Sequence, residues 1–294
     1  MVSREDDRDS QDGEGEGPDT HGTPDTHGVR GAHGALGAAV SAEDFGLKGA
    51  RGWVFRHVRI DTAPGTVVAI VGPSGSGRTC LLLALTGRMR PTEGRAEVGG
   101  LALPRAMAAV RRISSLGPVP GVSDLDPALT VAEQLRERAL LQRRFGGSLR
   151  ALLRPRADRA AEARDRIDAA LTAAGLDMAT LPKGERTSVR DLERLEALRL
   201  SVALALIGRP RLLAVDDLDL KLSDTGRAEA WQLMRSVADG GTTVLAVCSQ
   251  APEAGAGAVG VDGIVRTEES KDEPNEDTEH EEGAADALAE TGRA

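Results

Sequence analysis

A continuous apolar run that leads directly into a glycine-rich segment constrains the fold of this chain more than any other feature. Residues 66–71 read Thr-Val-Val-Ala-Ile-Val with no polar alternation, which is typical of a strand buried on both faces of a sheet. Residues 79–85 read Thr-Cys-Leu-Leu-Leu-Ala-Leu and predict a helix. The glycine-rich segment 72–77 joins the two. This order of strand, glycine-rich loop and helix is what a phosphate-binding loop requires.

The loop contains the residue types that phosphate binding needs. Its glycines allow backbone N–H groups to turn toward an anion, and the start of the helix adds the positive end of its dipole. Thr79 supplies a hydroxyl that can bind Mg²⁺. The alternative is a glycine-rich turn without a ligand, which the buried strand before it and the apolar helix after it disfavour. The candidate nucleotide-binding residues are Gly72, Pro73, Ser74, Gly75, Ser76, Gly77, Arg78, Thr79 and Cys80.

Further strands and helices alternate along the chain. Apolar runs predict strands at 211–215 and 242–248. Segments rich in Ala, Leu and Arg predict helices at 130–145, 155–175, 190–207 and 225–238. This alternation predicts an α/β fold with a mainly parallel sheet, helices on its faces and a helical insertion at 130–207 between two strands.

The formal charge of −9 over 294 residues is unevenly distributed. Residues 1–42 contain nine acids and three arginines, and residues 267–294 contain eleven acids and two bases. The middle of the chain, 43–266, therefore has a net charge of +6. Both ends are poor in large apolar side chains, so burial cannot offset the entropy cost of ordering them. We expect a disordered acidic tail with His and Gly at 1–42, a folded domain at 43–266 and a disordered acidic tail at 267–294.

Composition excludes several other classes of protein. Aromatic residues make up only 2% of the chain, which argues against modules that bind through many aromatic side chains. The two cysteines exclude a disulfide scaffold and a four-cysteine zinc site. The sequence contains no uninterrupted apolar stretch of about 18 residues, so no transmembrane helix is predicted. The acidic N-terminus does not resemble a signal peptide. The expected location is therefore the cytoplasm.

Several short segments on both sides of the loop add a family resemblance. They are Val54-Phe55, Pro64-Gly65, Leu81-Leu-Leu, Thr86-Gly87, Pro91-Thr-Glu-Gly94, Leu129-Thr-Val-Ala-Glu133, 203–210, 212–217 and 243–247. Together with the loop, over about 45–266, they resemble the ATP-binding subunit of ATP-binding cassette (ABC) transporters. The resemblance implies a P-loop NTPase fold with a mainly parallel sheet core, an antiparallel β edge and a helical subdomain at about 128–207.

The resemblance also implies ligands, roles and partners. ATP is the expected ligand, with Mg²⁺ held by Thr79 and, through water, by Asp216. Asp217 occupies the general-base position that the family fills with Glu. The expected partners are a membrane permease made as a separate chain and a second ATP-binding cassette subunit, in a homodimer or heterodimer; nucleic acid is not expected. The subunit would lie on the cytoplasmic face of the membrane. An Arg-rich face of the helical subdomain either meets the permease or is simply solvated: Arg136, Arg138, Arg143, Arg144, Arg150, Arg154 and Arg156.

Several positions depart from the family pattern. Arg78 replaces the lysine of the loop, and Arg is longer, planar and forked. Residues 192–196, Leu-Glu-Arg-Leu-Glu, replace the signature Leu-Ser-Gly-Gly-Gln, which in the family contacts the nucleotide of the opposite subunit. No Gln occurs between 80 and 133, where the family has one that senses Mg²⁺ and water, and Ser249 replaces the switch histidine.

These departures predict a subunit that binds Mg-ATP and hydrolyses it slowly or only with a partner, because several groups that stabilise the transition state are lost together. The alternative is a catalytically inactive cassette that acts as a regulatory or scaffold subunit. The chain also has no Tyr to stack on adenine. Phe45 and Trp53 flank the expected position, and Trp53 fits an ordinary strand residue equally well.

Overall fold

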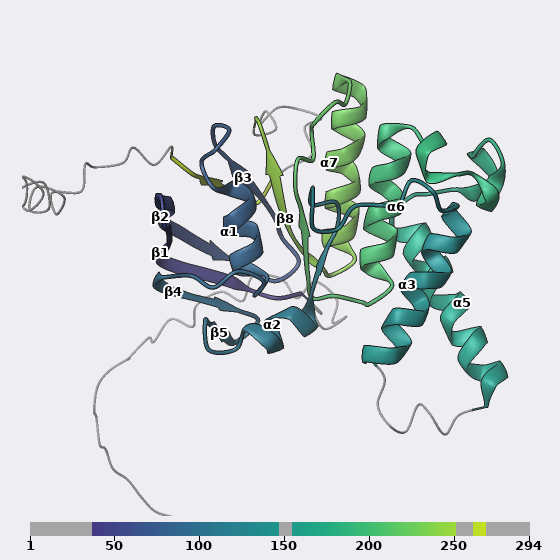
Figure 1. Cartoon of the computed structure of the whole chain (residues 1–294), viewed down its shortest axis with the longest axis horizontal. Coiled ribbons are helices and arrows are strands. Elements are labelled where there is room, and N and C mark those ends of the chain that lie inside the picture. The colour runs from purple at the N-terminus through teal and green to yellow at the C-terminus, as the bar shows by residue number, and fades with distance from the viewer. Residues whose placement is uncertain (1–36, 147–154, 251–260, 269–294) are drawn as a thin grey trace, which may run out of the picture. The chain divides into compact units, whose positions relative to one another are not determined.

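The computed structural model describes residues 37–146, 155–250 and 261–268, and all of them belong to one compact unit (Figure 1). Most of the two predicted acidic tails lies outside these residues. Among the described residues, every helix is too short or too polar to span a lipid bilayer.

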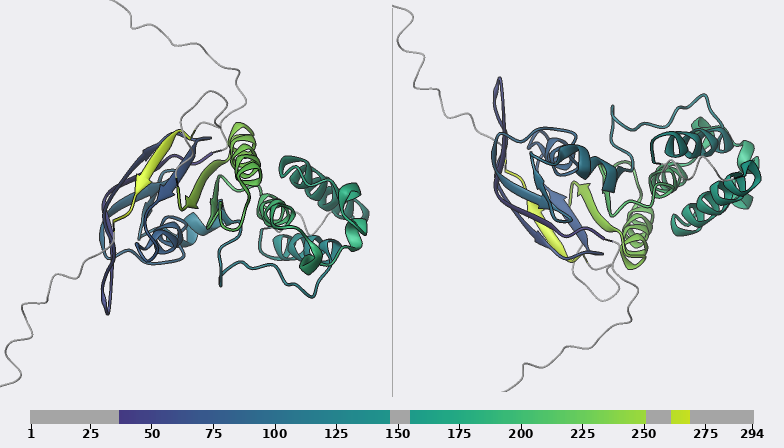
Figure 2. Two further views of the ribbon diagram at one scale, coloured as in Figure 1. Left: turned by 90° about the horizontal axis from the view of Figure 1, so that it is seen from above. Right: turned by 90° about the horizontal axis from the view of Figure 1, so that it is seen from below.

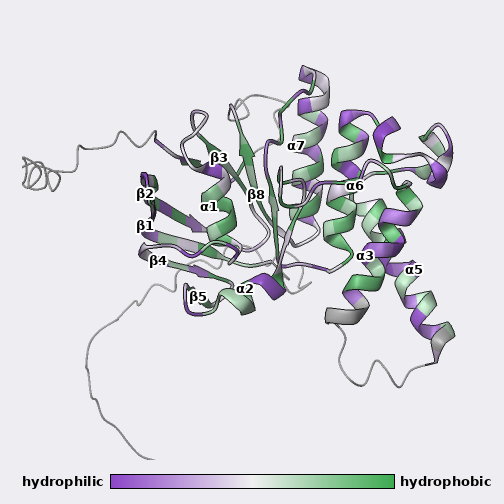
Figure 3. Ribbon diagram, in the orientation of Figure 1, coloured by the Kyte–Doolittle hydropathy of each residue, from purple (hydrophilic) through white to green (hydrophobic). Residues whose placement is uncertain are grey.

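A five-stranded parallel sheet forms the centre of the fold. Its strand order is β6 (Ser114–Leu116), β7 (Leu212–Val215), β8 (Thr243–Cys248), β3 (Val67–Val71) and β9 (Gly263–Arg266). Every residue of β3, β7 and β8 is buried, as the apolar runs predict (green in Figure 3). Because the strands are parallel, the loops that follow β3, β7 and β8 meet at one edge of the sheet.

An antiparallel sheet covers one side of this core. It has the order β2 (Gly52–Thr62), β1 (Val40–Gly49), β4 (Glu93–Val98) and β5 (Leu101–Leu103). Helix α1 (Arg78–Leu85) lies between the two sheets, where its Leu81, Leu82 and Leu85 share one apolar core with both (Figure 1). The predicted antiparallel β edge and mainly parallel core are confirmed.

The opposite face of the parallel sheet is covered by α6 (Arg194–Leu206) and α7 (Asp224–Asp239). Helix α6 also belongs to a separate apolar core with α3 (Val131–Gly146) and α5 (Arg156–Ala173), which makes the helical subdomain (Figure 2). Three short 3₁₀ turns, Met178–Thr180, Gly184–Arg186 and Val189–Asp191, connect α5 to α6. The short helix α2 (Met107–Ile113) precedes β6. The whole insertion lies between β6 and β7, which are adjacent in the sheet.

The structure shifts three predicted boundaries. The first strand begins at Val40, three residues before the predicted start of the folded domain, and Val40 is fully buried. At the other end, Thr267 is also buried, one residue beyond the predicted end. The helix predicted at 190–207 begins only at Arg194, because Glu193 has extended backbone angles and caps it.

Candidate phosphate-binding site

The predicted phosphate loop occupies the turn between β3 and α1. Gly77 forms the N-cap of α1 with a left-handed backbone (φ 77°), and a Cβ there would overlap the carbonyl of Val54 in β2. A Cβ on Gly72 would overlap Thr267. Pro73, Ser74 and Gly75 are exposed, whereas Ser76 is buried. Helix α1 has no acidic residue in its first turn and no side-chain cap, so its free N–H groups can donate hydrogen bonds to an anion.

Arg78, the residue in the place of the family lysine, is partly buried. Its Nη1 donates a 2.7 Å hydrogen bond to the carbonyl oxygen of Cys248, the last residue of β8. The guanidinium therefore ties the loop after β3 to the end of β8, two strands that are neighbours in the sheet.

Thr79 and Asp216, the two predicted magnesium-binding residues, lie in contact. The Thr79 hydroxyl donates to Asp216 Oδ2 at 2.6 Å, and the backbone N–H of Asp217 donates to Asp216 Oδ1 at 2.9 Å. Burial raises the pKa of the Asp216 carboxyl, and the bond from Thr79 opposes that rise. No group of three His, Cys, Asp or Glu side chains that could hold a metal occurs in the described ranges. A hydroxyl and one carboxylate nevertheless fit Mg²⁺ bound to a nucleotide, because such ions take most ligands from phosphate and water.

Asp217, the predicted general base, follows directly after Asp216 and has a left-handed backbone (φ 48°). This conformation is uncommon for a residue with a Cβ, although Asp tolerates it better than most. Its carbonyl oxygen accepts the N–H of Leu220, which closes a tight turn after β7. The turn fixes the backbone at Asp217. The role of the Asp217 side chain as a general base stays a prediction.

Asp219 is a buried carboxylate that sequence reasoning missed. It accepts hydrogen bonds from the backbone N–H and the hydroxyl of Ser249 and from the N–H of Gln250. The residue in the switch position is therefore bound to the loop after β7 of its own chain. The signal that could have identified Asp219 is an acid just after a buried strand, at an edge where neighbouring loops meet.

The segment after β6, where the family has its sensing Gln, runs along β7. The N–H of Gly117 donates to the carbonyl of Ala214, and the carbonyl of Pro118 accepts the N–H of Asp216 at 2.9 Å. The Ser123 hydroxyl donates to the carbonyl of Gly117 at 2.6 Å. The position beside Asp216 is thus occupied by Pro118, which offers a backbone carbonyl but has no N–H group to donate a hydrogen bond.

The start of α6, where the family signature is expected, is capped by its own carboxylates. The Glu193 side chain accepts the N–H of Glu196, and Glu196 Oε2 accepts the N–H of Glu193 at 2.8 Å. This reciprocal pair is a capping box, and it satisfies donors that a helix start otherwise offers to an anion. The two helix starts therefore differ: that of α1 can receive phosphate, and that of α6 carries negative charge.

The two aromatic residues near the expected adenine position lie in the antiparallel sheet. Phe45 is fully buried against Phe55, with ring centroids 5.8 Å apart, so it belongs to the core. Trp53 is a residue of β2, and the Lys48 ammonium lies 5.6 Å from its ring centroid. Cys80 is partly buried against the core between the sheets.

A cavity of about 480 Å³ lies between the segment after β6 and the helices α3 and α6. Its lining includes two partly buried guanidiniums, those of Arg88 and Arg138. Burial lowers the pKa of both, and that of Arg88 falls to about 10 because Arg111 and Arg138 repel it as well. Both donate to carbonyl oxygens, but neither forms an ion pair with a carboxylate of a described residue. The exposed side chains of Val122 and Leu141 also line this cavity, which we call the arginine pocket.

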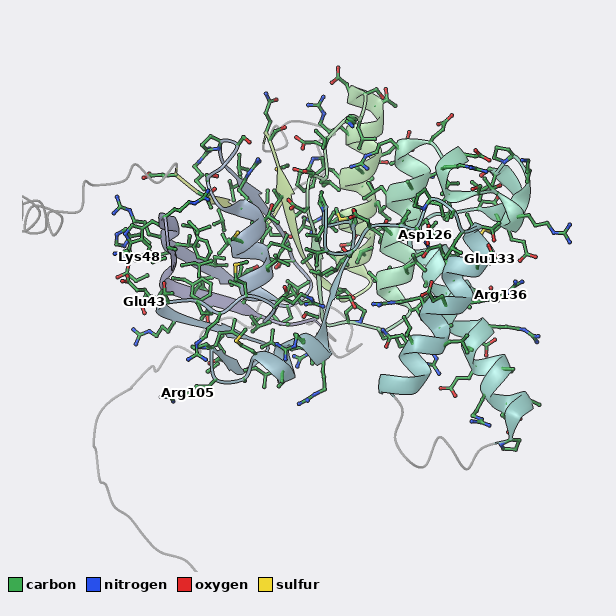
Figure 4. The ribbon with its side chains drawn as sticks, viewed as in Figure 1. Glu43, Lys48, Arg105, Asp126, Glu133 and Arg136 are labelled. Carbon is green, nitrogen blue, oxygen red and sulfur yellow. The ribbon has the colours of Figure 1, made fainter. Side chains whose placement is uncertain are left out.

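Three carboxylates also line the arginine pocket, those of Asp124, Asp126 and Glu137. Asp124 and Asp126 accept N–H groups of their own loop, and Figure 4 labels Asp126 on this loop and Glu133 and Arg136 on α3. Of the predicted Arg-rich face, Arg136 is exposed and Arg138 lines the pocket. The other side chains fall outside the described residues: Arg143, Arg144, Arg150, Arg154 and Arg156.

Comparisons with known proteins agree with the sequence resemblance. The family model described as "ABC transporter" matches residues 55–218. The chain is 36% identical over 193 residues to the daunorubicin resistance ATP-binding protein DrrA3 of Streptomyces coeruleorubidus, covering 65% of this chain and 54% of that protein. It is 30% identical over 186 residues to the zinc import ATP-binding protein ZnuC 2 of Hahella chejuensis, covering 63% and 62% of the two chains. The match thus spans little more than half the length of such relatives.

Solved structures show the same fold at low sequence identity. The dimeric bacterial ABC transporter cassette MJ0796 superposes with a TM-score of 0.59 at 20% identity, covering 78% of this chain and 94% of that one. CbiO1 of Clostridium perfringens, part of an ABC transporter complex, gives 0.58 at 18% identity, covering 72% and 78%.

Proposed function

This chain belongs to the ABC transporter family, and we propose that it is an ATP-binding subunit that couples nucleotide binding to a separate membrane permease. Nucleotide would bind at residues 72–80, with its phosphates on the N–H groups of the loop and of the α1 start. Thr79 and Asp216 would hold Mg²⁺, which neutralises phosphate charge when bound. The observation that carries the proposal is the uncapped α1 start beside the paired Thr79 and Asp216.

Hydrolysis is proposed to be slow or dependent on a partner. The Ser249 hydroxyl is bonded to Asp219, and Pro118 offers only a carbonyl next to Asp216. Asp217 is one methylene shorter than the family Glu. Loss of one preorganised donor can cost about 10²–10³ in rate, and several are absent together.

We also propose assembly with a second cassette subunit. In the family, ATP lies between the phosphate loop of one subunit and the signature helix of the other. The capped start of α6, with the carboxylates of Glu193 and Glu196, would repel the phosphates of a partner's nucleotide. A heterodimer with a partner that has an intact signature would therefore have one competent site and one weak site.

The arginine pocket is the surface that we propose for contact with the permease, on the cytoplasmic face of the membrane. Arg88 and Arg138 are partly buried and form no ion pair within the described residues, so an acidic group of a partner could bind them favourably. Exposed Val122 and Leu141 beside them add apolar area that a partner could cover.

The second candidate is a regulatory or scaffold subunit that binds nucleotide without turnover. The observation that favours it is that Ser249 and the α6 start, two groups expected to meet nucleotide, are both bonded within the chain. It differs from the first candidate in having no permease partner. Co-purification of the full chain from membranes with a permease supports the first candidate, and a water-soluble complex without one supports the second.

Nucleotide affinity tests the central proposal. ATP binding by full-length protein would be measured with and without Mg²⁺ for wild type, Arg78→Lys and Thr79→Ala. We expect Mg²⁺ to strengthen binding in wild type and Arg78→Lys, and Thr79→Ala to lose most of that gain. The Arg78→Lys variant has a second use: tighter binding means that Arg78 weakens the site, and looser binding means that it is adapted to it. Absence of ATP binding in all three proteins would refute the proposal. Fast turnover abolished by Asp217→Asn would refute slow hydrolysis.

A further inference from the structure

The C-terminal end of the described chain lies directly beside the phosphate loop. After β9, which pairs with β3, the N–H of Thr267 donates to the carbonyl of Val71 at 2.9 Å. The hydroxyls of Thr267 and Ser76 are 2.7 Å apart, and both residues are buried. Glu268 is exposed. The segment that follows Thr267 therefore starts beside Ser76, which directly precedes Gly77 and Arg78 in the loop at the carboxyl edge of the parallel sheet.

The chemistry of that segment is complementary to the loop. Residues 268–290 contain eleven acids and one base, Lys271, and their one large apolar side chain is Leu288. They cannot dock by apolar burial, so charge is their means of attraction. The loop offers the uncapped start of α1 and the cation of Arg78, within a domain of net charge +6 over 43–266.

Tether length allows this contact. An extended chain covers about 3.3–3.6 Å per residue, so about five residues after Thr267 reach about 17 Å. Glu269, Asp272 and Glu273 fall within or just beyond that reach. A tether of about five residues gives an effective local concentration of about millimolar, which makes weak carboxylate contacts significant.

We propose that the acidic segment 268–290 docks on the phosphate loop of its own chain and competes there with the phosphates of nucleotide. The proposal rests on the proposed function of this loop as the nucleotide site. Each carboxylate carries less charge than a terminal phosphate group and has two acceptor oxygens instead of three. Docking of the segment therefore weakens nucleotide binding without abolishing it. The contact is electrostatic and is screened by salt.

The N-terminal acidic segment supplies a matched control. Residues 1–36 contain nine acids and three arginines, a net charge of −6. This segment joins the fold at Gly37 and Ala38, where the N–H of Ala38 donates to the carbonyl of Arg211 and its carbonyl accepts the Thr243 hydroxyl. Arg211 and Thr243 stand at the amino ends of β7 and β8, the opposite edge of the sheet from the phosphate loop.

The test compares four proteins: wild type, a chain that ends at Glu268, a full-length chain with every Glu and Asp of 269–290 changed to Gln or Asn, and a chain without 1–36. Affinity for a fluorescent ATP analogue with Mg²⁺ would be measured at about 50 mM and 500 mM salt, after circular dichroism has shown that all four are folded. We expect deletion and neutralisation of the C-terminal segment each to tighten binding about three- to tenfold at low salt. At high salt the difference disappears, and removal of 1–36 changes nothing.

Four outcomes overturn the proposal. They are equal affinity with and without 269–294, weaker binding after the deletion, a neutralised segment that behaves like wild type, and an equal gain on removal of 1–36. In these cases nucleotide binding, and with it the proposed function, stands. If none of the four proteins binds the analogue, both the proposed function and this inference are wrong.

Discussion

The capping box at the start of α6 gives a prediction whose size follows from the structure. Glu193→Ala removes the side chain that accepts the backbone N–H of Glu196, whereas the backbone N–H of residue 193 can still donate to Glu196 Oε2. Loss of an N-cap acceptor costs about 1 kcal/mol. A larger loss is not expected, because Glu193 and Arg194 are exposed and the buried part of the helix begins at Leu198. For a domain of this size, about 1 kcal/mol lowers Tm by about 2–4 °C.

Thermal and urea unfolding of wild type, Glu193→Ala and Glu193→Ser would measure this effect. Ser is among the best N-cap residues, so Glu193→Ser should keep the free energy of unfolding within a few tenths of a kcal/mol of wild type. Glu196→Ala should cost less than Glu193→Ala, and the double variant less than the sum of the two, since the side chains form one reciprocal pair. Unchanged stability in Glu193→Ala, or an equal loss in Glu193→Ser, would show that the box does not stabilise α6 in solution.

Three further outcomes follow from the site. Gly77→Ala should abolish ATP binding and lower the free energy of unfolding by about 1–3 kcal/mol, because its Cβ overlaps a carbonyl of β2; retention of wild-type affinity would contradict the loop geometry. Asp219→Ala should speed amide hydrogen exchange at Ser249 and leave exchange in the centre of β8 unchanged; equal protection would show that the Asp219 contact does not hold the loop. Burial raises the pKa of the Cys248 thiol to about 12, so a thiol reagent at pH 8 should react with Cys80 only, and slowly, with ATP giving protection; reaction of Cys248 in folded protein would refute its burial.

Sequence reasoning predicted the elements whose pattern is local. The runs at 66–71, 211–215 and 242–248 are buried on both faces, so they contain no polar alternation, and all three are central strands. The family resemblance was confirmed for the same reason, since its landmarks are short segments of continuous chain. The predicted helix at 190–207 starts four residues earlier than the observed one, because an apolar pattern does not reveal at which residue an N-cap starts the helix.

What the sequence could not provide are contacts between distant residues. Asp219 reads as one acid among many until the fold places it against Ser249. The anchoring of Thr267 on Ser76 depends on β9 pairing with β3, and nothing in the composition of an acidic tail predicts that pairing. Arg88 and Arg138 meet at one cavity only because β6 and the helical subdomain pack together.

Three of the contacts described above close a ring around the ends of β3, β7 and β8. Thr79 is bonded to Asp216, Asp219 to Ser249, and Arg78 to the carbonyl of Cys248. A ligand that draws the Arg78 Nη1 group or the Thr79 hydroxyl proton away from these partners loosens one side of this triangle, and the cost of loosening it is part of its binding free energy. Phosphate affinity and the mobility of the loop that contains Ser249 are then linked in both directions. A change that holds Ser249 more firmly therefore also changes how tightly a phosphate binds, even though Ser249 does not contact it.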